Sequence, residues 1–346
     1  MQGNVFFKRV IQIGAYMLLL ALLPENARAL STPRPLAATN ALFLPLVMRD
    51  RREIEIGAFV GVSPPTVAAV TAFETLTGRH LRSVLWYQGW SSTDRPAFPG
   101  AGLNLVRDHD GYNTGLVEHL TWEPWAPLAS IAGGAYDAYL SAYAQQVKNW
   151  GGPLRLRFGH EMIQNNVLDG GEWYPWQDQP ADYKAAFRHV HAVFQAAGAA
   201  NVEFVFCPQN YPSDLDIVRQ YYPGPEYVDW LCMDGYNSAS PWQWFDDIFY
   251  NLYHTFTDHP DVFGGKPVML GEFASCEAAP ANNPWETKSV WIQNAFERIK
   301  SPDYSHLRLF YWFHAEKDCG WRVDTSPGSL AAFKSAISDP MFISHP

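Results

Sequence analysis

The sequence predicts an α/β protein with the (β/α)8 barrel fold. Eight short apolar runs alternate along the chain with longer segments of helical periodicity. Strict alternation of strands and helices indicates parallel pairing, and eight such units close naturally into a barrel. Polar residues follow six of the runs, as expected where the carboxyl ends of barrel strands meet at one rim. A doubly wound open sheet is the alternative.

The expected strands are apolar runs bounded by Gly, Pro or polar residues: Ile54 to Val60, Ser83 to Tyr87, Leu116 to Thr121, Leu154 to His160, Val202 to Cys207, Val228 to Asp234, Pro267 to Gly271 and Leu307 to Phe313. The expected helices are Thr66 to Thr77, Ala135 to Trp150, Ala181 to Ala197, Trp242 to Thr257, Glu286 to Lys300 and Leu330 to Ser338. Gly198 is a natural stop after the third of them. The stretch Gln88 to Asn113, rich in Gly and Pro, shows no clear helix.

Residues 1–29 are expected to form an export signal. Lys8 and Arg9 precede the apolar run Val10 to Leu23, and Ala27-Arg28-Ala29 supplies a small-x-small cleavage site. The apolar run is shorter than the roughly 20 residues that span a bilayer, although retention as an uncleaved anchor is the alternative. Residues 30–52 are expected to be a linker, and residues 53–346 a single catalytic domain. We expect a secreted monomer with no membrane attachment after cleavage.

Composition favours a neutral polymer as the partner. The formal charge of -10 argues against nucleic acid and anionic membranes as binding partners, because both bind proteins through basic patches. The chain contains 14 Trp, 17 Tyr and 21 Phe, many of them in segments rich in Pro and Gly. Sugar rings stack their C–H faces on aromatic rings, so aromatic loops fit a carbohydrate cleft. Most of the rings are nevertheless expected in the core.

Four cysteines matter because an exported protein retains disulfides. Their spacing matches no zinc pattern. Cys276 and Cys319 lie beyond the ends of neighbouring predicted strands, so a bridge between two loops is plausible. Cys207 and Cys232 are expected to be buried thiols, and the sequence alone does not fix the pairing.

Two runs that end in glutamate carry the chemistry: Arg157 to Met162 and Pro267 to Phe273. Each places one carboxylate, Glu161 or Glu272, where a buried strand reaches the rim. Retaining glycosidases need such a pair, one protonated to release the leaving sugar and one ionised to attack the anomeric carbon. A zinc protease needs a second His on the same helix face, where Gln164 stands instead. A salt bridge from Glu161 to a neighbouring arginine is the structural alternative.

The neighbours of the two glutamates suggest distinct roles. Burial beside Trp173 or Trp176 would raise the pKa of Glu161, as a general acid requires. Gly271 leaves room for close approach to Glu272, and a hydrogen bond from Tyr236 would keep Glu272 ionised. On the same predicted strand, Asp234 is expected to pair with a buried arginine such as Arg157, a structural role.

These motifs, in this order, resemble glycoside hydrolase family 26. The resemblance covers roughly Gly57 to Phe342 and is carried by the runs Arg157 to Met162, Trp173 to Trp176, Asp234 to Asn237 and Gly271 to Phe273, together with Trp312. The family contains retaining endo-β-mannanases, some mixed-linkage β-glucanases and β-1,3-xylanases on a (β/α)8 barrel, with catalytic glutamates after strands four and seven.

The resemblance implies a role for each matching residue. Glu161 would be the acid/base, Glu272 the nucleophile and His160 a substrate-contacting neighbour, while Tyr236 would be the partner of the nucleophile. Aromatic residues expected to bind sugar are Trp312, Trp122, Trp173 and Trp176. The insert Gln164 to Glu172 departs from the family pattern, and the Trp173 to Trp176 run looks nearer to the glucanase branch, so glucan is weighted slightly over mannan.

The sequence therefore predicts a secreted retaining endo-β-glycanase that acts on mixed-linkage β-glucan or β-mannan and needs no metal or organic cofactor. Two alternatives stay open. One is a noncatalytic polysaccharide-binding barrel with the same aromatic cleft. The other is a transglycosylase, because water and sugar compete for one covalent intermediate.

Overall fold

The computed structural model describes residues 52–109, 115–163, 173–277, 283–317 and 319–344. They contain a closed barrel of eight parallel strands. The first strand, β1 (Ile54–Phe59), pairs with both β2 (Ser83–Ser91) and β8 (Leu307–Phe313), so the sheet closes on itself. The (β/α)8 prediction is confirmed, and the open-sheet alternative is wrong.

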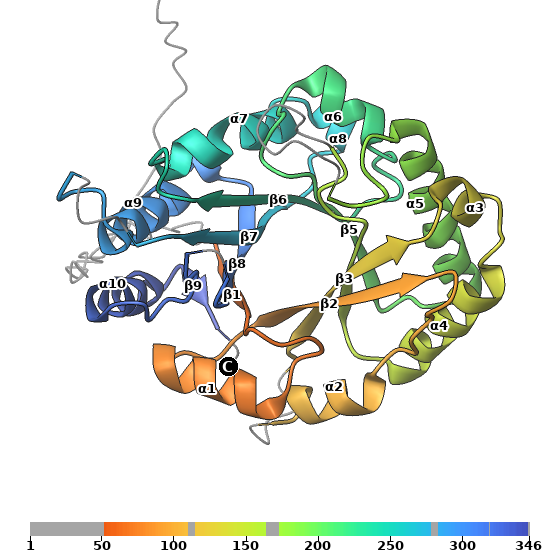
Figure 1. Ribbon diagram of the computed structural model, residues 1–346, viewed down its shortest axis with the longest axis horizontal. Helices are drawn as coiled ribbons and strands as arrows, with labels where there is room; N and C mark the ends of the chain where they lie inside the picture. Colours follow the sequence, from red (N-terminus) through yellow and green to blue (C-terminus); the bar gives the residue numbers. More distant parts are fainter. Residues whose placement is uncertain (1–51, 110–114, 164–172, 278–282, 318, 345–346) are drawn as a thin grey trace, which may run out of the picture. The chain divides into compact units, whose positions relative to one another are not determined.

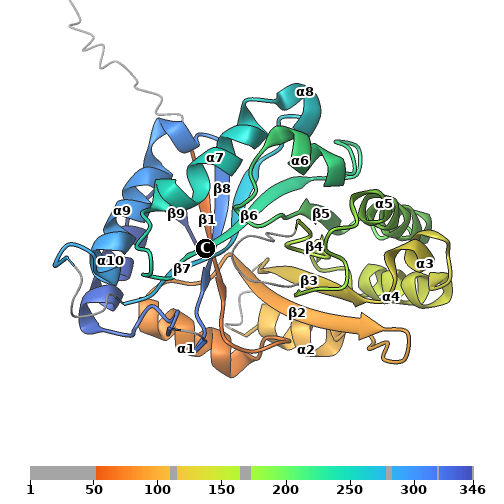
Figure 2. The same cartoon turned by 45° about the horizontal axis from the view of Figure 1, so that its top comes forward.

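The remaining strands follow in chain order: β3 (Val117–Trp125), β4 (Leu154–Phe158), β5 (Val202–Phe206), β6 (Trp230–Asn237), β7 (Val268–Ser275) and the two-residue β9 (Phe342–Ile343), which pairs with β1. The helices are α1 (Val67–Thr77), α2 (Gly100–Arg107), α3 (Leu128–Ala132), α4 (Asp137–Trp150), α5 (Pro180–Ala197), α6 (Leu215–Tyr221), α7 (Phe245–Thr257), α8 (Pro260–Phe263), α9 (Lys288–Lys300) and α10 (Pro327–Ile337), with a 3₁₀ turn at Pro302–Tyr304. The helices form a ring around the strands (Figures 1 and 2).

All six predicted helices are present, and two further helices alternate with the strands where none was expected. The helix α2 lies inside the Gly- and Pro-rich stretch, where Gly100 and Gly102 weaken helical propensity. Burial of Leu103 and Val106 against the barrel compensates for that weakness. The short α6 is held in the same way by Val218 and Tyr221, which propensity alone does not reveal. At the end of α5, Gly198 has φ 73°, as predicted for the helix stop.

Several strands extend further toward the rim than predicted. Most important for the site are β3, which continues to Trp125, and β7, which continues to Ser275. Side chains along a strand alternate between its two faces, here the barrel interior and the helix layer. Extension of a strand therefore fixes which rim residues face the interior.

The described residues contain two disulfide bonds. The predicted bridge between Cys276 and Cys319 is confirmed, with 5.4 Å between the two Cα atoms. The expectation of two buried thiols is wrong, because Cys207 and Cys232 are also bonded to each other. Cys207 directly follows β5, and Cys232 lies on the adjacent strand β6, with 4.3 Å between the two Cα atoms.

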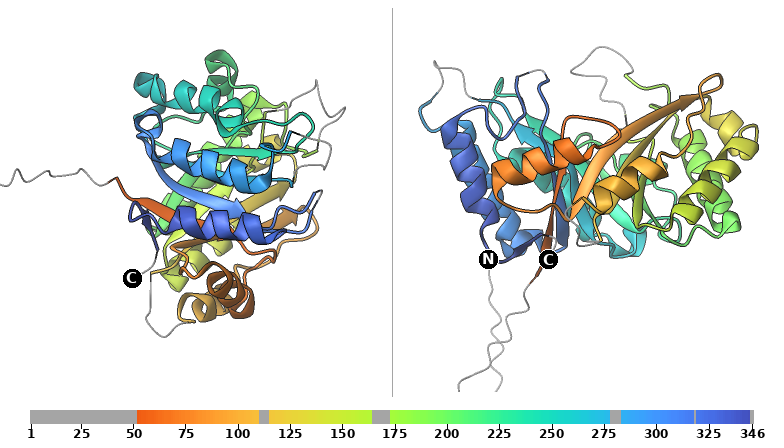
Figure 3. Two further views of the ribbon diagram at one scale, coloured as in Figure 1. Left: turned by 90° about the vertical axis from the view of Figure 1, so that its left-hand side faces the viewer. Right: turned by 90° about the horizontal axis from the view of Figure 1, so that it is seen from below.

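The export signal and nearly all of the predicted linker lie outside the described residues. The last linker residue, Arg52, is fixed to the barrel, because its guanidinium donates hydrogen bonds to the backbone oxygens of Ile299 and Tyr304. Within the described part of the chain, no helix combines the length and the apolar character needed to cross a bilayer. Figure 3 shows the barrel and its helices from two further sides.

Candidate active site

Glu161 lies just beyond the carboxyl end of β4, as the sequence predicts. Glu272 was expected after the seventh strand but lies inside β7, next to an irregularity in the ladder, because β7 continues to Ser275. In the pairing of β7 with β6, Leu270 is opposite Met233 and Glu272 is opposite Asp234, so Gly271 is an extra residue in β7. Such a bulge re-aims the side chain that follows it. A bulge was not predicted.

Gly271 is required by its surroundings. A Cβ atom at this position would lie 2.3 Å from Sγ of Cys232 and 2.5 Å from Oδ1 of Asp234. Both contacts are far shorter than side chains allow, so only glycine fits. The predicted close approach at Gly271 is confirmed.

Glu272 accepts hydrogen bonds from three side chains. The phenol of Tyr87 donates to Oε1 at 2.6 Å, Nη2 of Arg157 donates to the same oxygen at 2.5 Å, and the phenol of Tyr236 donates to Oε2. Burial would raise the pKa of the carboxyl, but the charge of Arg157 and the two phenol hydrogen bonds outweigh burial and lower it to about 2. Glu272 is therefore held as an anion, and the predicted partnership with Tyr236 is confirmed.

A buried ion pair positions the arginine beneath this carboxylate. Nη1 of Arg157 donates to both carboxylate oxygens of Asp234, at 2.9 and 2.8 Å, and both residues are fully buried. The hydroxyl oxygen of Thr121 accepts from Nε and Nη2 of the same guanidinium. Because Nε, Nη1 and Nη2 all donate hydrogen bonds, the guanidinium has one fixed orientation. The predicted pairing of Asp234 with Arg157 is confirmed.

Glu161 has a contrasting environment. Burial, reinforced by the negative charge of Glu272, raises the pKa of its carboxyl to about 8. Arg155 pairs with Glu55 and Glu203 instead of Glu161, and Arg157 pairs with Asp234 and Glu272, so the structural alternative of a salt bridge is not realised. The carboxyl is therefore held in its protonated form near neutral pH.

The backbone of Glu161 is strained in a way typical of functional positions. Its φ of 52° is in the left-handed region, which disfavours a residue with a side chain. Two hydrogen bonds hold this conformation: the amide of Glu161 donates to the carbonyl of Cys207, and Nε2 of Gln177 donates to the carbonyl of Glu161. The direction in which the side chain leaves β4 is thereby fixed.

His160 is 2% exposed and packs against aromatic side chains. Its ring centroid lies 4.9 Å from that of Tyr174 and 5.9 Å from that of Tyr87. Burial, together with the charge of Arg157, lowers the pKa of the imidazole to about 3. His160 is therefore neutral and can serve as a hydrogen-bonding group without adding charge to the site.

Three tryptophans predicted to bind sugar are fully buried, which contradicts a direct contact. Trp122 faces the helix layer and stacks on Tyr143 of α4. Trp312 faces α10 and packs against Phe333. Trp176 donates from Nε1 to the carbonyl of His160 and stacks beneath Tyr174, with 4.5 Å between centroids. The fourth predicted residue, Trp173, is 59% exposed and stays a prediction.

Two residues at the site were missed. Tyr87 ends the second predicted strand and faces inward. The expectation that polar residues at the carboxyl ends of barrel strands lie at the site could therefore have found it. Trp321 lies in the loop after β8, with its ring centroid 4.9 Å from that of Tyr236, and the sequence gives no signal for it. Its carbonyl accepts from Nε1 of Trp312, so the buried Trp312 supports Trp321 from behind.

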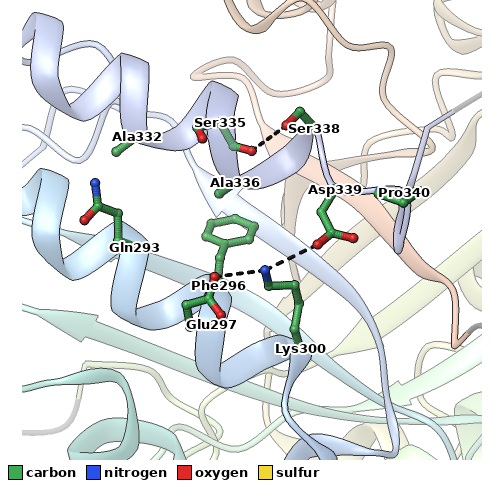
Figure 4. Close-up of a pocket in the computed structure, with 10 residues that line it drawn as sticks. All are labelled: Gln293, Phe296, Glu297, Lys300, Ala332, Ser335, Ala336, Ser338, Asp339 and Pro340. Carbon is green, nitrogen blue, oxygen red and sulfur yellow. Dashed lines mark hydrogen bonds and ion pairs between the residues drawn. The ribbon is translucent and has the colours of Figure 1, made fainter.

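A groove on the outside of the barrel is separate from this site. Figure 4 shows it between α9 and α10, with a volume of about 410 Å³. Nζ of Lys300 lies there at 2.9 Å from Glu297 and 3.3 Å from Asp339. Neither Glu161 nor Glu272 lines the groove, so it is not the candidate active site.

A closed (β/α)8 barrel with two carboxyl groups at one rim, one held protonated and one held ionised, is an arrangement that glycoside hydrolases use. Comparison with known proteins gives the family. The sequence model of glycosyl hydrolase family 26 matches residues 128–261. The chain is 34% identical over 303 residues to Endoglucanase H of Acetivibrio thermocellus, which covers 82% of this chain and 30% of that protein. The chain belongs to glycoside hydrolase family 26.

Further relatives agree with this assignment. Mannan endo-1,4-beta-mannosidase of Bacillus subtilis is 25% identical over 204 residues, covering 54% of this chain and 46% of that protein. The chain thus spans less than half the length of the curated relatives it matches. A family 26 β-mannanase from Bacteroides ovatus has the same fold, with a TM-score of 0.61 at 17% identity over 85% of this chain and 91% of that one. A Cellulomonas fimi endo-β-1,4-mannanase also has this fold, with a TM-score of 0.61 at 19% identity over 85% of this chain and 72% of that one.

Proposed function

We propose that the chain is a retaining endo-β-glycanase in which Glu161 is the acid/base and Glu272 the nucleophile. The observation that carries the proposal is the asymmetry between the two carboxyl groups. Glu272 accepts hydrogen bonds from Tyr87, Tyr236 and Arg157, and its pKa is lowered to about 2, whereas the pKa of Glu161 is raised to about 8. Environments that separate two pKa values in this way assign the base and the acid.

The reaction proceeds in two displacements. In the first, a carboxylate oxygen of Glu272 bonds to the anomeric carbon while the glycosidic C–O bond breaks, and the proton of Glu161 passes to the departing oxygen. In the second, Glu161 takes a proton from water, the water oxygen bonds to the anomeric carbon, and the bond to Glu272 breaks. This mechanism requires the two carboxyl groups to be roughly 5–5.5 Å apart.

We infer that mixed-linkage β-glucan is the preferred substrate, with β-mannan second. The higher identity to a protein named an endoglucanase than to one named a mannosidase supports this order. The half-buried Tyr174, which is close enough to Glu161 to be affected by its charge, and the exposed Trp173 that precedes it in the chain would provide stacking faces for sugar rings. A panel of mixed-linkage glucan, mannan and β-1,3-xylan with product lengths read out tests both the substrate and the endo mode of attack.

The two catalytic roles are tested by substitution. Glu272→Ala should abolish hydrolysis, because no nucleophile remains. Glu161→Ala should lose polysaccharide hydrolysis but keep activity on aryl glycosides whose leaving group needs no proton. Glu226→Gln, at an exposed glutamate, is the control and should hydrolyse like the wild type. Proton NMR of the first product should show the β-anomer, and an α-anomer would contradict retention.

Two rival functions have distinct outcomes. If the wild type binds polysaccharide but cleaves nothing in the panel, the chain is a binding module. If added sugar acceptors shift the products toward longer chains at the expense of hydrolysis, it is a transglycosylase. The three donors on Glu272 argue against the binding module, since a stacking cleft needs no buried nucleophile. We further propose export through the signal at residues 1–29, which N-terminal sequencing of the secreted protein would test.

A further inference from the structure

Two histidines and a glutamate meet at the end of the barrel opposite the candidate active site. Glu74 is in α1, His80 is in the turn before β2, and His109 follows α2, so all three lie near the amino-terminal ends of the strands. The helices α1 and α2 lie side by side (Figures 1 and 3). We propose that these three side chains bind a divalent transition metal ion of the zinc class.

The ligand atoms already converge. Oε2 of Glu74 lies 2.9 Å from Nε2 of His109 and 3.2 Å from Nδ1 of His80. Zinc bonds of about 2.0–2.2 Å to nitrogen and oxygen place neighbouring ligands of a tetrahedral site about 3.3 Å apart. The two contacts of Glu74 with the histidines need to lengthen by only a few tenths of an ångström to admit the ion, and all three ligand atoms lie within 4.8 Å of one another.

The proton positions at His109 favour a cation. Its Nδ1 lies 2.7 Å from the carbonyl oxygen of Val106, which can only accept, so Nδ1 carries a proton. In neutral His109 the lone pair of Nε2 then faces the carboxylate oxygen of Glu74. Either a second proton or a metal ion must lie near that contact. A divalent ion could be coordinated by Nε2 of His109 and Nδ1 of His80 at the same time, whereas one proton lies in only one of their two contacts with Glu74.

Both buried ligands have the outer hydrogen bonds that metal ligands typically show. A ligating histidine usually donates its other ring N–H to a carbonyl or carboxylate, as Nδ1 of His109 does to Val106. The second carboxylate oxygen of Glu74, Oε1, accepts from the amide of Leu81 at 2.8 Å, which leaves Oε2 for an ion. Each ligand is therefore oriented by the backbone.

The surroundings leave an open position. The cluster lines a hollow of about 310 Å³, where the side chain of His80 is 51% exposed, so an ion and a water molecule can enter. Arg79 lines the same hollow, and its guanidinium donates to the carbonyls of Ile337 and Phe342 at 2.7 Å each. The guanidinium is thus held at α10 and β9 instead of pairing with Glu74.

Ligand chemistry selects the ion class. Two imidazoles and one carboxylate suit zinc and neighbouring transition metals, whereas magnesium and calcium prefer oxygen ligands throughout. Because the site joins α1, the turn before β2 and the segment after α2, a bound ion would act as a staple at the stabilising face of the barrel. It would be remote from the two catalytic carboxyl groups.

Metal binding is tested on the full chain after dialysis against EDTA. Isothermal titration with Zn²⁺ should give one tight site per chain, and Co²⁺ should produce the visible absorption of a tetrahedral site. His80→Ala, at the exposed ligand, should weaken Zn²⁺ binding at least tenfold. Zn²⁺ should raise the unfolding midpoint of the wild type but not of this variant, and Mg²⁺ should leave it unchanged.

A matched control separates this site from other histidines. His189→Ala removes a histidine that contacts a single carboxylate, Asp137, at 2.6 Å, and should bind Zn²⁺ like the wild type. Glu74→Gln keeps an oxygen for the amide of Leu81 and should bind weakly. If the wild type takes up no stoichiometric Zn²⁺, or if His80→Ala and Glu74→Gln both bind like the wild type, the cluster is an ion-pair network and the proposal is wrong. Hydrolysis should be unchanged throughout, so failure here leaves the proposed catalytic function intact.

Discussion

At the scale of single residues, the proposed mechanism depends on three hydrogen bonds to one carboxylate. Tyr87, Tyr236 and Arg157 come from β2, β6 and β4, and each donates to Glu272 on β7. Charged hydrogen bonds of this kind contribute about 1.5–3 kcal/mol each, which corresponds to one to two pH units in the pKa of the acceptor. Removal of a single donor should therefore be measurable in a pH profile.

We predict a bell-shaped dependence of kcat/KM on pH. Activity requires ionised Glu272 and protonated Glu161, so it should fall as pH drops toward about 2 and as it rises through about 8. Tyr87→Phe removes a donor to the charged form of Glu272, raises its pKa and moves the acidic limb upward by roughly one to two units, with the basic limb unchanged. Initial rates across the pH range on a soluble substrate measure both limbs.

The control for this measurement is Tyr139→Phe. The Tyr139 phenol donates to the carbonyl of Pro96 and does not contact Glu272, so both limbs should stay in place. An acidic limb that does not move in Tyr87→Phe would show that ionisation of Glu272 does not govern the reaction.

At the scale of secondary structure, the extra residue in β7 is the device that aims Glu272. We predict that Gly271→Ala destabilises the protein by about 1–3 kcal/mol through overpacking. The new methyl group would press on Cys232, Asp234 and Arg157, displace the guanidinium and lower kcat about 10- to 100-fold. Urea unfolding and steady-state kinetics measure the two effects.

A second glycine provides the comparison. Gly102→Ala adds a methyl group within α2 that meets no atom within 4 Å. It should stabilise the protein by about 0.5–1 kcal/mol and leave kcat unchanged, because alanine is the better helix former. Equal behaviour of the two variants would mean that the bulge does not constrain the site.

The sequence predicted those parts of the site that lie in one local run. Glu161, Glu272 and Tyr236 each end or follow an apolar stretch, and the rim of the barrel brings such ends together. Assigning Trp122 to the sugar cleft was wrong because β3 runs to Trp125, beyond the predicted end of the strand, so strand alternation turns Trp122 toward the helices. Trp312 lies inside β8, whose bounds are as predicted, and alternation along that strand turns it toward α10.

Other features depend on contacts between distant segments. The bulge at Gly271 is visible only in the register of β7 against its neighbours, and Trp321 reaches Tyr236 from a loop. The bond between Cys207 and Cys232 requires β5 and β6 to be adjacent, which the barrel topology provides only after closure. Local patterns contain none of this information.

At the scale of the whole barrel, two loops are joined by a covalent bond at the rim. The Cys276–Cys319 disulfide closes a segment with a sequence separation of 43 residues that includes α9 and β8. Chain entropy predicts that Cys276→Ser with Cys319→Ser lowers the free energy of unfolding by about 4 kcal/mol. Unfolding by guanidinium should show this loss, and added reductant should bring the wild type to the same midpoint unless Cys207–Cys232 contributes as well.

The variant Cys207→Ser with Cys232→Ser separates these contributions. In that background the reductant acts on Cys276–Cys319 alone, so any remaining shift of the midpoint belongs to the rim disulfide. A reductant without effect in that background would contradict the predicted stabilisation.

The short strand β9 places Phe342 beside Ile54, and the amide of Ile54 donates to the carbonyl of Met341. The last strand of the chain, β9, thus lies beside the beginning of β1, at the end of the barrel away from Glu161 and Glu272. β9 and β1 are therefore held together by hydrogen bonds, although no peptide bond joins them. A circular permutant that joins residue 343 to residue 54 by a short linker and opens the chain in another loop at that end should fold to the same barrel.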